Sequence, residues 1–246
     1  MSFAQVYTRS VVGLNAPSVI VEVHLSQGLP AVTMVGLAET AVRESKDRVR
    51  SAIINSGFQF PNRRLTINLA PADLPKDGAR LDLPIAIGIL AASGQIDDGL
   101  LERHELIGEL ALNGDLRPIA GALAVSRAVK IEQRALIVPK DNASEAVKVA
   151  GAAVLAADTL KAVCQHLQNE QTIAYSEHKK TYQINRYPLD LADVKGQHQA
   201  RRALEIAAAG GHSLLFCGSP GTGKTLMASR LPSILPPLSE DEALAV

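Results

Sequence analysis

The stretch GSPGTGKT, residues 218–225, decides the fold class of the chain around it. It fits the phosphate-loop (Walker A) pattern of glycine, four residues and then Gly-Lys-Thr. The glycines let backbone N–H groups close around phosphates, Lys224 supplies a cation and Thr225 supplies a hydroxyl for Mg²⁺. Residues 212–217 predict a short buried strand before the loop, and residues 224–230 a helix after it. This order predicts an α/β nucleotide-binding unit; the alternative is a glycine-rich turn without a ligand.

The composition is that of a globular protein. The chain has 246 residues, 47% of them hydrophobic, and its 25 basic and 25 acidic side chains balance, so no bulk positive charge indicates nucleic acid. Cys164 and Cys217 lie far apart without metal-ligand spacing, which argues against a disulfide framework or a zinc site. No run of about 18 apolar residues indicates a membrane span. We therefore expect a cytoplasmic protein.

Strand and helix patterns alternate through the first part of the chain. The predicted strands are 18–25, 31–35, 65–69, 104–110, 116–119, 135–138 and 153–156. The predicted helices are 40–55, an apolar helix that follows Asp82 and is ended by Ser93-Gly94, 122–130, a segment after Asn142, and 160–167. Asp82 is expected to cap its helix. Residues 70–78 predict a long, constrained loop, and Asn113-Gly114-Asp115 a hairpin turn. The expected fold class is α/β or α+β with layered packing.

Charged residues of both signs cover the predicted helix 40–55. They are Arg43, Glu44, Lys46, Asp47, Arg48 and Arg50. The first interpretation is a solvated helix face, and the second is a binding surface.

The composition changes near residue 169. Residues 169–187 are polar with little apolar periodicity, which predicts a linker between a domain at 1–168 and a second one at 188–246. In the second domain, residues 199–209 predict a helix with Ala203, Ile206 and Ala207 on one face, ended by Gly210 and Gly211.

The chain resembles the bacterial ComM/YifB proteins, which are magnesium-chelatase-like AAA+ ATPases. The resemblance runs along the whole chain and is carried by VIVEVH (19–24), MVGL (34–37), RVRSAIINSG (48–57), NLAPADLPK (68–76), DLPIA (82–86), DVKGQ (193–197) and the phosphate loop. Each string alone is weak, but together and in order they are specific.

The resemblance implies a Lon-protease-like domain of the ribosomal S5-like type at 1–168 and the beginning of an AAA+ module at 188–246. It further implies ATP and Mg²⁺ as cofactors, a hexameric ring, single-stranded or branched DNA as partner, and branch migration during natural transformation. The implied nucleotide-binding residues are Val194, Gly196, Gly218, Ser219, Pro220, Gly221, Thr222, Gly223, Lys224, Thr225 and Leu226, with Thr225 also at the Mg²⁺.

The Lon-like resemblance raises a second chemistry, which this sequence argues against. Active Lon peptidases carry a serine nucleophile two residues after Pro-Lys-Asp-Gly and a lysine base in a later helix. The matching positions here hold Arg80 and Leu123, which provide neither a nucleophile nor a base. We expect no peptidase activity, and we interpret Lys76 and Asp77 first as loop charges and second as partner contacts.

The catalytic carboxylate, sensor and arginine finger of an AAA+ motor normally follow the phosphate loop. Residues 226–246 contain three prolines and the acids Glu240, Asp241 and Glu242, with no strand before them, so we expect the N-terminal part of a longer ATPase with negligible turnover alone. Two other functions stay open: a chelatase-like assembly factor, and a first domain that only binds partners or shapes the ring.

Overall fold

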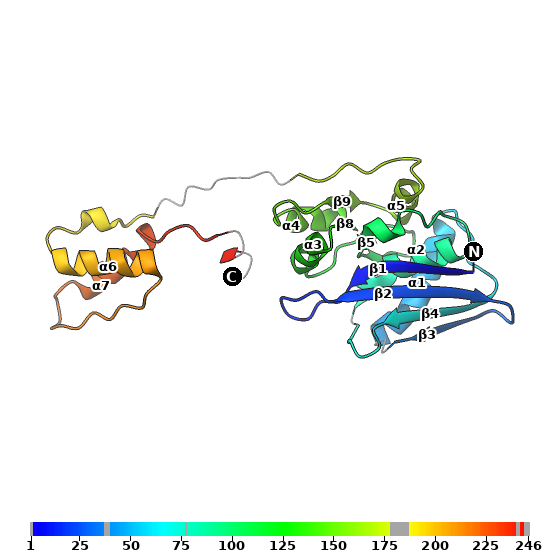
Figure 1. Ribbon diagram of the computed structural model, residues 1–246, viewed down its shortest axis with the longest axis horizontal. Coiled ribbons are helices and arrows are strands. Elements are labelled where there is room, and N and C mark those ends of the chain that lie inside the picture. Colours follow the sequence, from blue (N-terminus) through cyan, green and yellow to red (C-terminus); the bar gives the residue numbers. More distant parts are fainter. Residues whose placement is uncertain (1, 37–39, 77, 178–186, 240–241, 244–246) are drawn as a thin grey trace. The chain divides into compact units, whose positions relative to one another are not determined.

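The computed structural model describes residues 2–36, 40–76, 78–177, 187–239 and 242–243, and the side chains of residues 40–44 are outside that description. The chain forms two compact units, Met1–Lys179 and Lys180–Val246 (Figure 1). Each unit is described by itself.

A seven-stranded sheet forms the centre of the first unit. Its order is β3 (Ala31–Val35), β4 (Arg64–Ala70), β2 (Ser18–Ser26), β1 (Phe3–Arg9), β5 (His104–Leu106), β8 (Ala135–Pro139) and β9 (Val154–Ala157). The pairings of β2 with β1 and with β4 are antiparallel, and the other neighbours are parallel. A hairpin of β6 (Glu109–Leu110) and β7 (Leu116–Arg117) lies outside this sheet. The predicted α/β class is confirmed.

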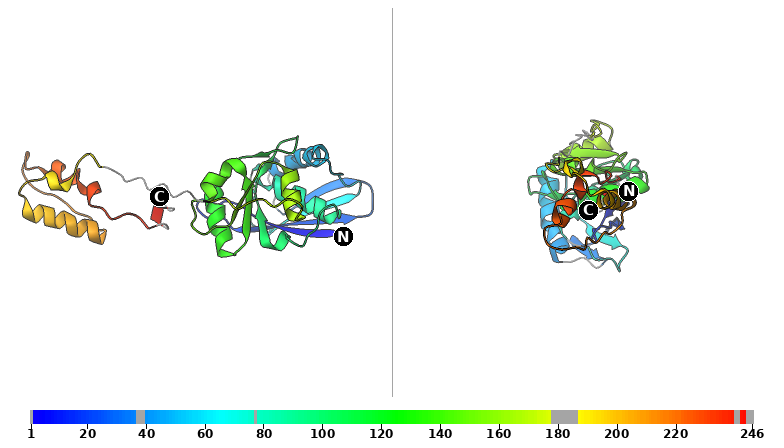
Figure 2. Two further views of the ribbon diagram at one scale, coloured as in Figure 1. Left: turned by 90° about the horizontal axis from the view of Figure 1, so that it is seen from above. Right: turned by 90° about the vertical axis from the view of Figure 1, so that its left-hand side faces the viewer.

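Helices pack on both faces of the sheet, as Figure 2 shows. On one face, α1 (Thr40–Asn55), α2 (Asp82–Ala92) and α5 (Leu160–Leu167) share a core with strand residues such as Val23 and Ile137. On the other, α3 (Ala122–Ile131) and α4 (Ala143–Ala146) share a second core with Leu136 and Val138. Successive residues of β8 therefore enter different cores, because side chains alternate along a strand.

Asp82 does not cap its helix, contrary to the prediction. Leu81 is the cap residue, and Asp82 is the fully buried first residue of α2. Its carboxylate accepts bonds from Arg48 Nε at 2.9 Å, Arg48 Nη2 at 3.2 Å and the Leu110 amide at 3.3 Å. Burial raises the pKa of Asp82 to about 6, and the bonds from Arg48 oppose that rise. Arg48 thus belongs to a buried ion pair that joins α1 to α2 rather than to a solvated face.

Lys76 is also misassigned by sequence reasoning, because it is fully buried rather than a solvated loop charge. Its ammonium donates to the carbonyl oxygen of Gly36, at 3.0 Å, and to that of Pro71. Burial lowers the pKa of Lys76, and the nearby Asp73 carboxylate opposes this. Lys76 therefore fastens the predicted loop to the end of β3. Asp77 lies outside the described residues.

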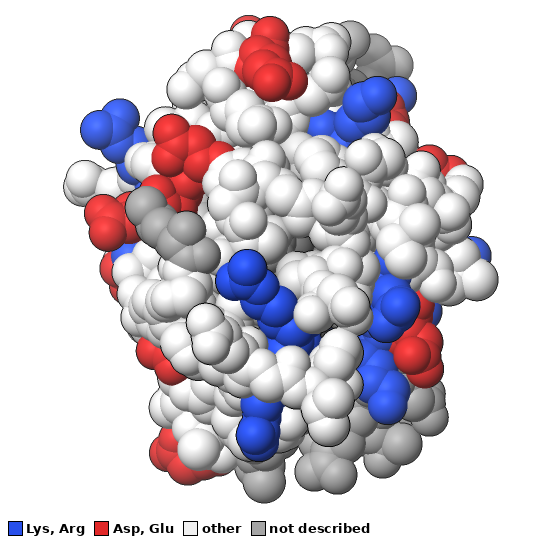
Figure 3. All heavy atoms as spheres, turned by 90° about the vertical axis from the view of Figure 1, so that its right-hand side faces the viewer, with Lys and Arg blue, Asp and Glu red and all other residues white. Residues whose placement is uncertain are grey.

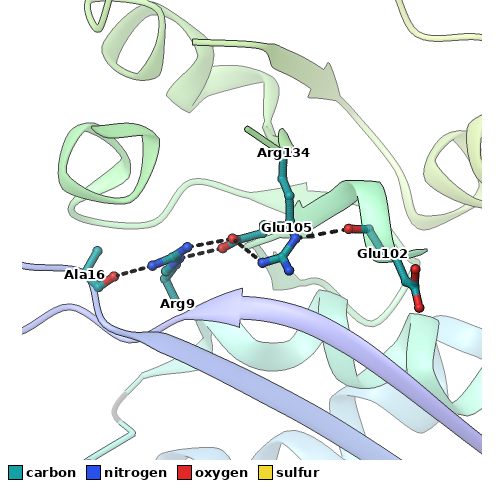
Figure 4. Close-up of polar contacts among 5 residues, drawn as sticks. All are labelled: Arg9, Ala16, Glu102, Glu105 and Arg134. Atoms are coloured by element: carbon teal, nitrogen blue, oxygen red, sulfur yellow. Dashed lines mark hydrogen bonds and ion pairs between the residues drawn. The ribbon is translucent and has the colours of Figure 1, made fainter. Parts of the chain in front are cut away.

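A buried charge network links β1 to β5 and to the start of β8 (Figure 4). The carboxylate of Glu105 is fully buried and accepts from Arg9 Nε at 2.6 Å, Arg9 Nη2 at 2.7 Å and Arg134 Nη1 at 3.2 Å. Arg9 also donates to the Ala16 carbonyl, and the Arg134 guanidinium lies 3.9 Å from the ring centre of Tyr7. The Glu105 carboxylate therefore compensates the charges of both Arg9 and Arg134.

The second unit is small. It contains the short 3-10 helices η4 (Leu191–Asp193) and η5 (Leu231–Ser233), together with α6 (His198–Gly210) and α7 (Lys224–Ala228). Its core joins Leu191, Val194, Leu204 and Met227. Helix α6 confirms the predicted segment and ends at Gly211 in the left-handed conformation. Of the residues predicted to share one face, Ala207 is buried and Ile206 is 51% exposed, and Leu204 and Ala208 are buried beside Ala207.

Candidate functional site

The candidate site is the loop at residues 218–223, which leads directly into α7. Gly221 and Gly223 adopt positive φ angles of 82° and 84°, and Gly223 is the residue before the helix. Residues other than glycine rarely adopt these backbone conformations, so both glycines are needed for the turn. The loop places Lys224 and Thr225 in the first turn of α7, as the motif predicts.

Lys224 lies over the loop that precedes it. Its ammonium donates to the carbonyl oxygens of Gly218 at 2.9 Å and Ser219 at 2.7 Å, and the Thr222 hydroxyl donates to Ser219 at 2.9 Å. The cation is thus held within reach of the loop backbone by bonds that phosphate oxygens can replace. An ammonium, glycine backbone and the exposed Thr225 hydroxyl form a donor set that fits a magnesium nucleotide.

The predicted buried strand before the loop is not formed. Residues 212–217 have no strand assignment, and all are exposed except Phe216, which is half-buried against the small core. A strand needs a neighbour for its backbone groups, and no described strand of this unit pairs with residues 212–217. The apolar pattern of Leu214 and Leu215 is present without the pairing that would bury it.

Val194 lies close to the phosphate-loop helix through packing. Its buried side chain joins the core that contains Met227 of α7, and its carbonyl accepts from Arg201 Nη1 at 3.3 Å. Gly196 follows with a φ of 70°. Leu226 is about half exposed on α7, and Ser219 and Pro220 are exposed in the loop. The structure therefore brings Val194 and the phosphate loop into one small unit, and the nucleotide contacts themselves stay a prediction.

The positions of the Lon-like dyad lie in the first unit. Arg80 is half-buried in the 3-10 helix η1 (Ala79–Leu81), where its carbonyl accepts from the Gly108 amide at 2.9 Å. Leu123 is half-buried near the start of α3, and its amide donates to Glu145 Oε1 at 3.0 Å. Neither side chain can act as the nucleophile or the base.

Acidic side chains do not gather into a metal centre in the described part of the chain, which contains no group of three or more His, Cys, Asp or Glu suited to a metal ion. Glu242 accepts from the amide and hydroxyl of Ser239, at 2.8 and 2.7 Å, and these bonds lower its pKa. Glu240 and Asp241 lie outside the described residues. None of the described helices is long and apolar enough to cross a membrane.

Comparisons with known proteins match each unit separately. Residues 21–142 match the family described as subunit ChlI of Mg-chelatase, and residues 190–246 match the family described as magnesium chelatase, subunit ChlI.

The chain is also similar to longer proteins. It is 53% identical to protein YifB of Escherichia coli K12, covering 99% of this chain and 48% of that protein. It is 50% identical to competence protein ComM of Haemophilus influenzae, covering 99% of this chain and 49% of that protein. A protein of Mycobacterium tuberculosis H37Rv is 41% identical, with 100% and 49% covered. The chain thus spans about half the length of the curated relatives it matches.

Proposed function

Because this chain belongs to the magnesium-chelatase-like AAA+ family that includes YifB and ComM, we propose that it carries the nucleotide cradle of an ATP-driven DNA motor. The observation that carries the proposal is the phosphate loop, in which two positive-φ glycines place Lys224 over the loop at the start of α7.

The nucleotide site uses residues of the second unit. The loop from Gly218 to Gly223 surrounds the phosphates, Lys224 neutralises their charge, and the Thr225 hydroxyl is a ligand of Mg²⁺. Val194 and Gly196 lie on the adenine side, and Leu226 completes the set. The bound MgATP supplies the phosphoryl group whose transfer to water drives the motor. In the longer relatives, the carboxylate that activates water would lie in the part that this chain does not match.

Residues 1–168 are, in this proposal, a Lon-like module without peptidase chemistry, and residues 169–187 link it to the AAA+ module at 188–246. The positions held by Arg80 and Leu123 support the loss of peptidase activity. The working protein is a cytoplasmic hexameric ring that acts on single-stranded or branched DNA and promotes branch migration. The similarity to a protein named for competence supports the DNA partner.

A second candidate function follows from the family descriptions, which name the ChlI subunit of magnesium chelatase. In that case the ATPase would remodel a protein partner rather than DNA. The similarity along almost the whole chain to a competence protein favours the DNA motor.

ATP hydrolysis by a full-length protein that carries this chain tests the proposal. We expect branched DNA to stimulate turnover, and Lys224→Ala to reduce it to background because the phosphates lose their cation. Lys161→Ala, which removes an exposed lysine from α5, is the matched control. Turnover that survives Lys224→Ala would refute the nucleotide site, and stimulation by a protein partner instead of DNA would favour the second function.

A further inference from the structure

A hollow of about 250 Å³ lies in the first unit between α1, the start of β3 and the segment 60–63. Three exposed cations line it, Lys46 and Arg50 from α1 and Arg63 from the segment, against the single carboxylate of Asp47. No described acidic side chain forms an ion pair with any of the three cations. In a chain with no net charge, this is a local excess of positive charge.

The walls of the hollow are held in place. The Arg50 guanidinium lies 5.0 Å from the ring centre of Phe60, which restrains both side chains. Gln95, just after α2, accepts from the Gln59 amide at 2.8 Å and donates to the Gln59 carbonyl at 2.7 Å. The segment that carries Arg63 is therefore fastened to the core of the unit instead of being a free loop.

Polar side chains continue the surface past Arg63. Residues 60–63 also line a second hollow of about 340 Å³, whose other walls include Gln59, Ser93 and Gln95. Figure 3 shows one end of the first unit, where Lys and Arg side chains occupy the centre and the lower right, and most acidic side chains lie towards the left and the top. Phosphate oxygens that cross residues 60–63 would meet Lys46 and Arg50 on one side, polar side chains on the other, and Arg63 between them.

We propose that this surface, defined by Lys46, Arg50, Phe60 and Arg63, binds the phosphodiester backbone of a single DNA strand. The inference rests on the proposed DNA motor and names a DNA-contacting surface outside the nucleotide cradle. Positive side chains beside an aromatic ring are typical of grooves that bind single strands without reading sequence. A hollow of about 250 Å³ has room for a segment of phosphodiester backbone. Lys46 and Arg50 thus belong, in this proposal, to a binding surface rather than to a merely solvated helix face.

The test compares binding of a labelled oligothymidine strand by two charge-matched variants of a full-length protein that carries this chain. One is Lys46→Gln/Arg50→Gln/Arg63→Gln, and the control is Arg127→Gln/Lys148→Gln/Lys161→Gln, which removes three exposed cations elsewhere on the first unit. We expect the first variant to bind more weakly, with a log–log salt slope shallower by about 2, because each lost contact with a single strand removes about 0.7. The control should keep the original slope. All six side chains are exposed, so thermal unfolding should be unchanged.

The outcomes separate the inference from the function on which it rests. If the unaltered protein binds no DNA, the proposed function fails. If it binds DNA and both triple variants keep its affinity and slope, this surface is not the site and the inference is overturned. A variant that keeps DNA binding but loses binding to polyglutamate also overturns it, because the partner is then an acidic protein. Placing Arg50→Lys in the triple variant instead of Arg50→Gln should recover about 0.7 of the lost slope, which would support a contact made by charge.

Discussion

Replacing Glu105 by alanine removes a carboxylate that compensates two cations, Arg9 and Arg134. Arg9, whose side chain is 6% exposed, loses two bonds of 2.6 and 2.7 Å, and Arg134, 22% exposed, loses one of 3.2 Å. A buried charge without its partner destabilises a fold more strongly than loss of the carboxylate's packing alone, because water cannot solvate it. Glu105→Ala should therefore weaken the junction of β1 with β5 and with the start of β8.

The expected cost is about 3–5 kcal/mol, the usual range for breaking one side of a buried ion pair. In a unit of this size each kcal/mol lowers the unfolding temperature by roughly 2–4 °C, so the midpoint should fall by about 10 °C. Far-UV circular dichroism during heating and in urea measures the change on the intact chain. Hydrogen exchange of the β1 and β5 amides would assign the loss to this network.

Two control variants test whether the loss of stability comes from the unpaired buried charges. Asp158→Asn breaks an ion pair with Lys140 whose partners are 63% and 68% exposed, and should cost less than about 1 kcal/mol. The triple replacement Arg9→Met/Glu105→Leu/Arg134→Leu removes all the charges and should be more stable than Glu105→Ala. If Glu105→Ala costs no more than Asp158→Asn, or if the triple variant is the less stable one, the stranded-charge argument is wrong.

Two further predictions concern the same unit. Burial raises the pKa of Asp82 to about 6, so folding favours its protonated form. The resulting stabilisation is complete below about pH 4 and is lost as the pH rises through 6, and it amounts to at most about 3 kcal/mol. Asp82→Asn should remove this pH dependence of the free energy of unfolding. Urea titrations from pH 4 to 7 that give parallel curves for both proteins would contradict it. Gly36 and Gly57 both have positive φ, 97° and 89°, but a Cβ on Gly36 would lie 2.2 Å from the Leu69 carbonyl oxygen, whereas one on Gly57 has no neighbour within 4 Å. Gly57→Ala should cost roughly the 1–2 kcal/mol of a left-handed residue and Gly36→Ala clearly more, and equal urea midpoints would exclude the clash.

Local pattern predicted most elements of the first unit because each obeys its own periodicity. The exceptions are β1, which was not predicted, and the predicted strand 104–110, which is divided into β5 and β6. Val19, Val21, Val23 and Leu25 alternate along β2 and are all buried, and α1 and α5 have the predicted bounds. The turn at Asn113-Gly114-Asp115 joins β6 and β7 as expected. In these segments the residues that decide the structure are neighbours in the sequence.

The buried charges could not be predicted in the same way. Arg9 and Glu105 are 96 residues apart, and Arg48 and Asp82 are 34 apart, so no spacing rule connects them. A lysine in a proline-rich loop normally stays in water, and Lys76 is buried only because the carbonyls of Gly36 and Pro71 meet there. Charged residues on one helix or strand are therefore predicted to be solvent-exposed, and only the folded structure shows whether another element provides an ionic partner that buries them.

The segment before the phosphate loop shows the same dependence for the backbone. β3 and residues 212–217 are both short and apolar, yet only β3 is a strand, because the backbone of β4 pairs with it from Ala31 to Val35. Phosphate binding needs the loop and the start of α7, which depend on glycine conformations within the loop itself, and these are formed. The phosphate loop is thus a local structure, whereas a strand at residues 212–217 would need the backbone of a neighbouring strand.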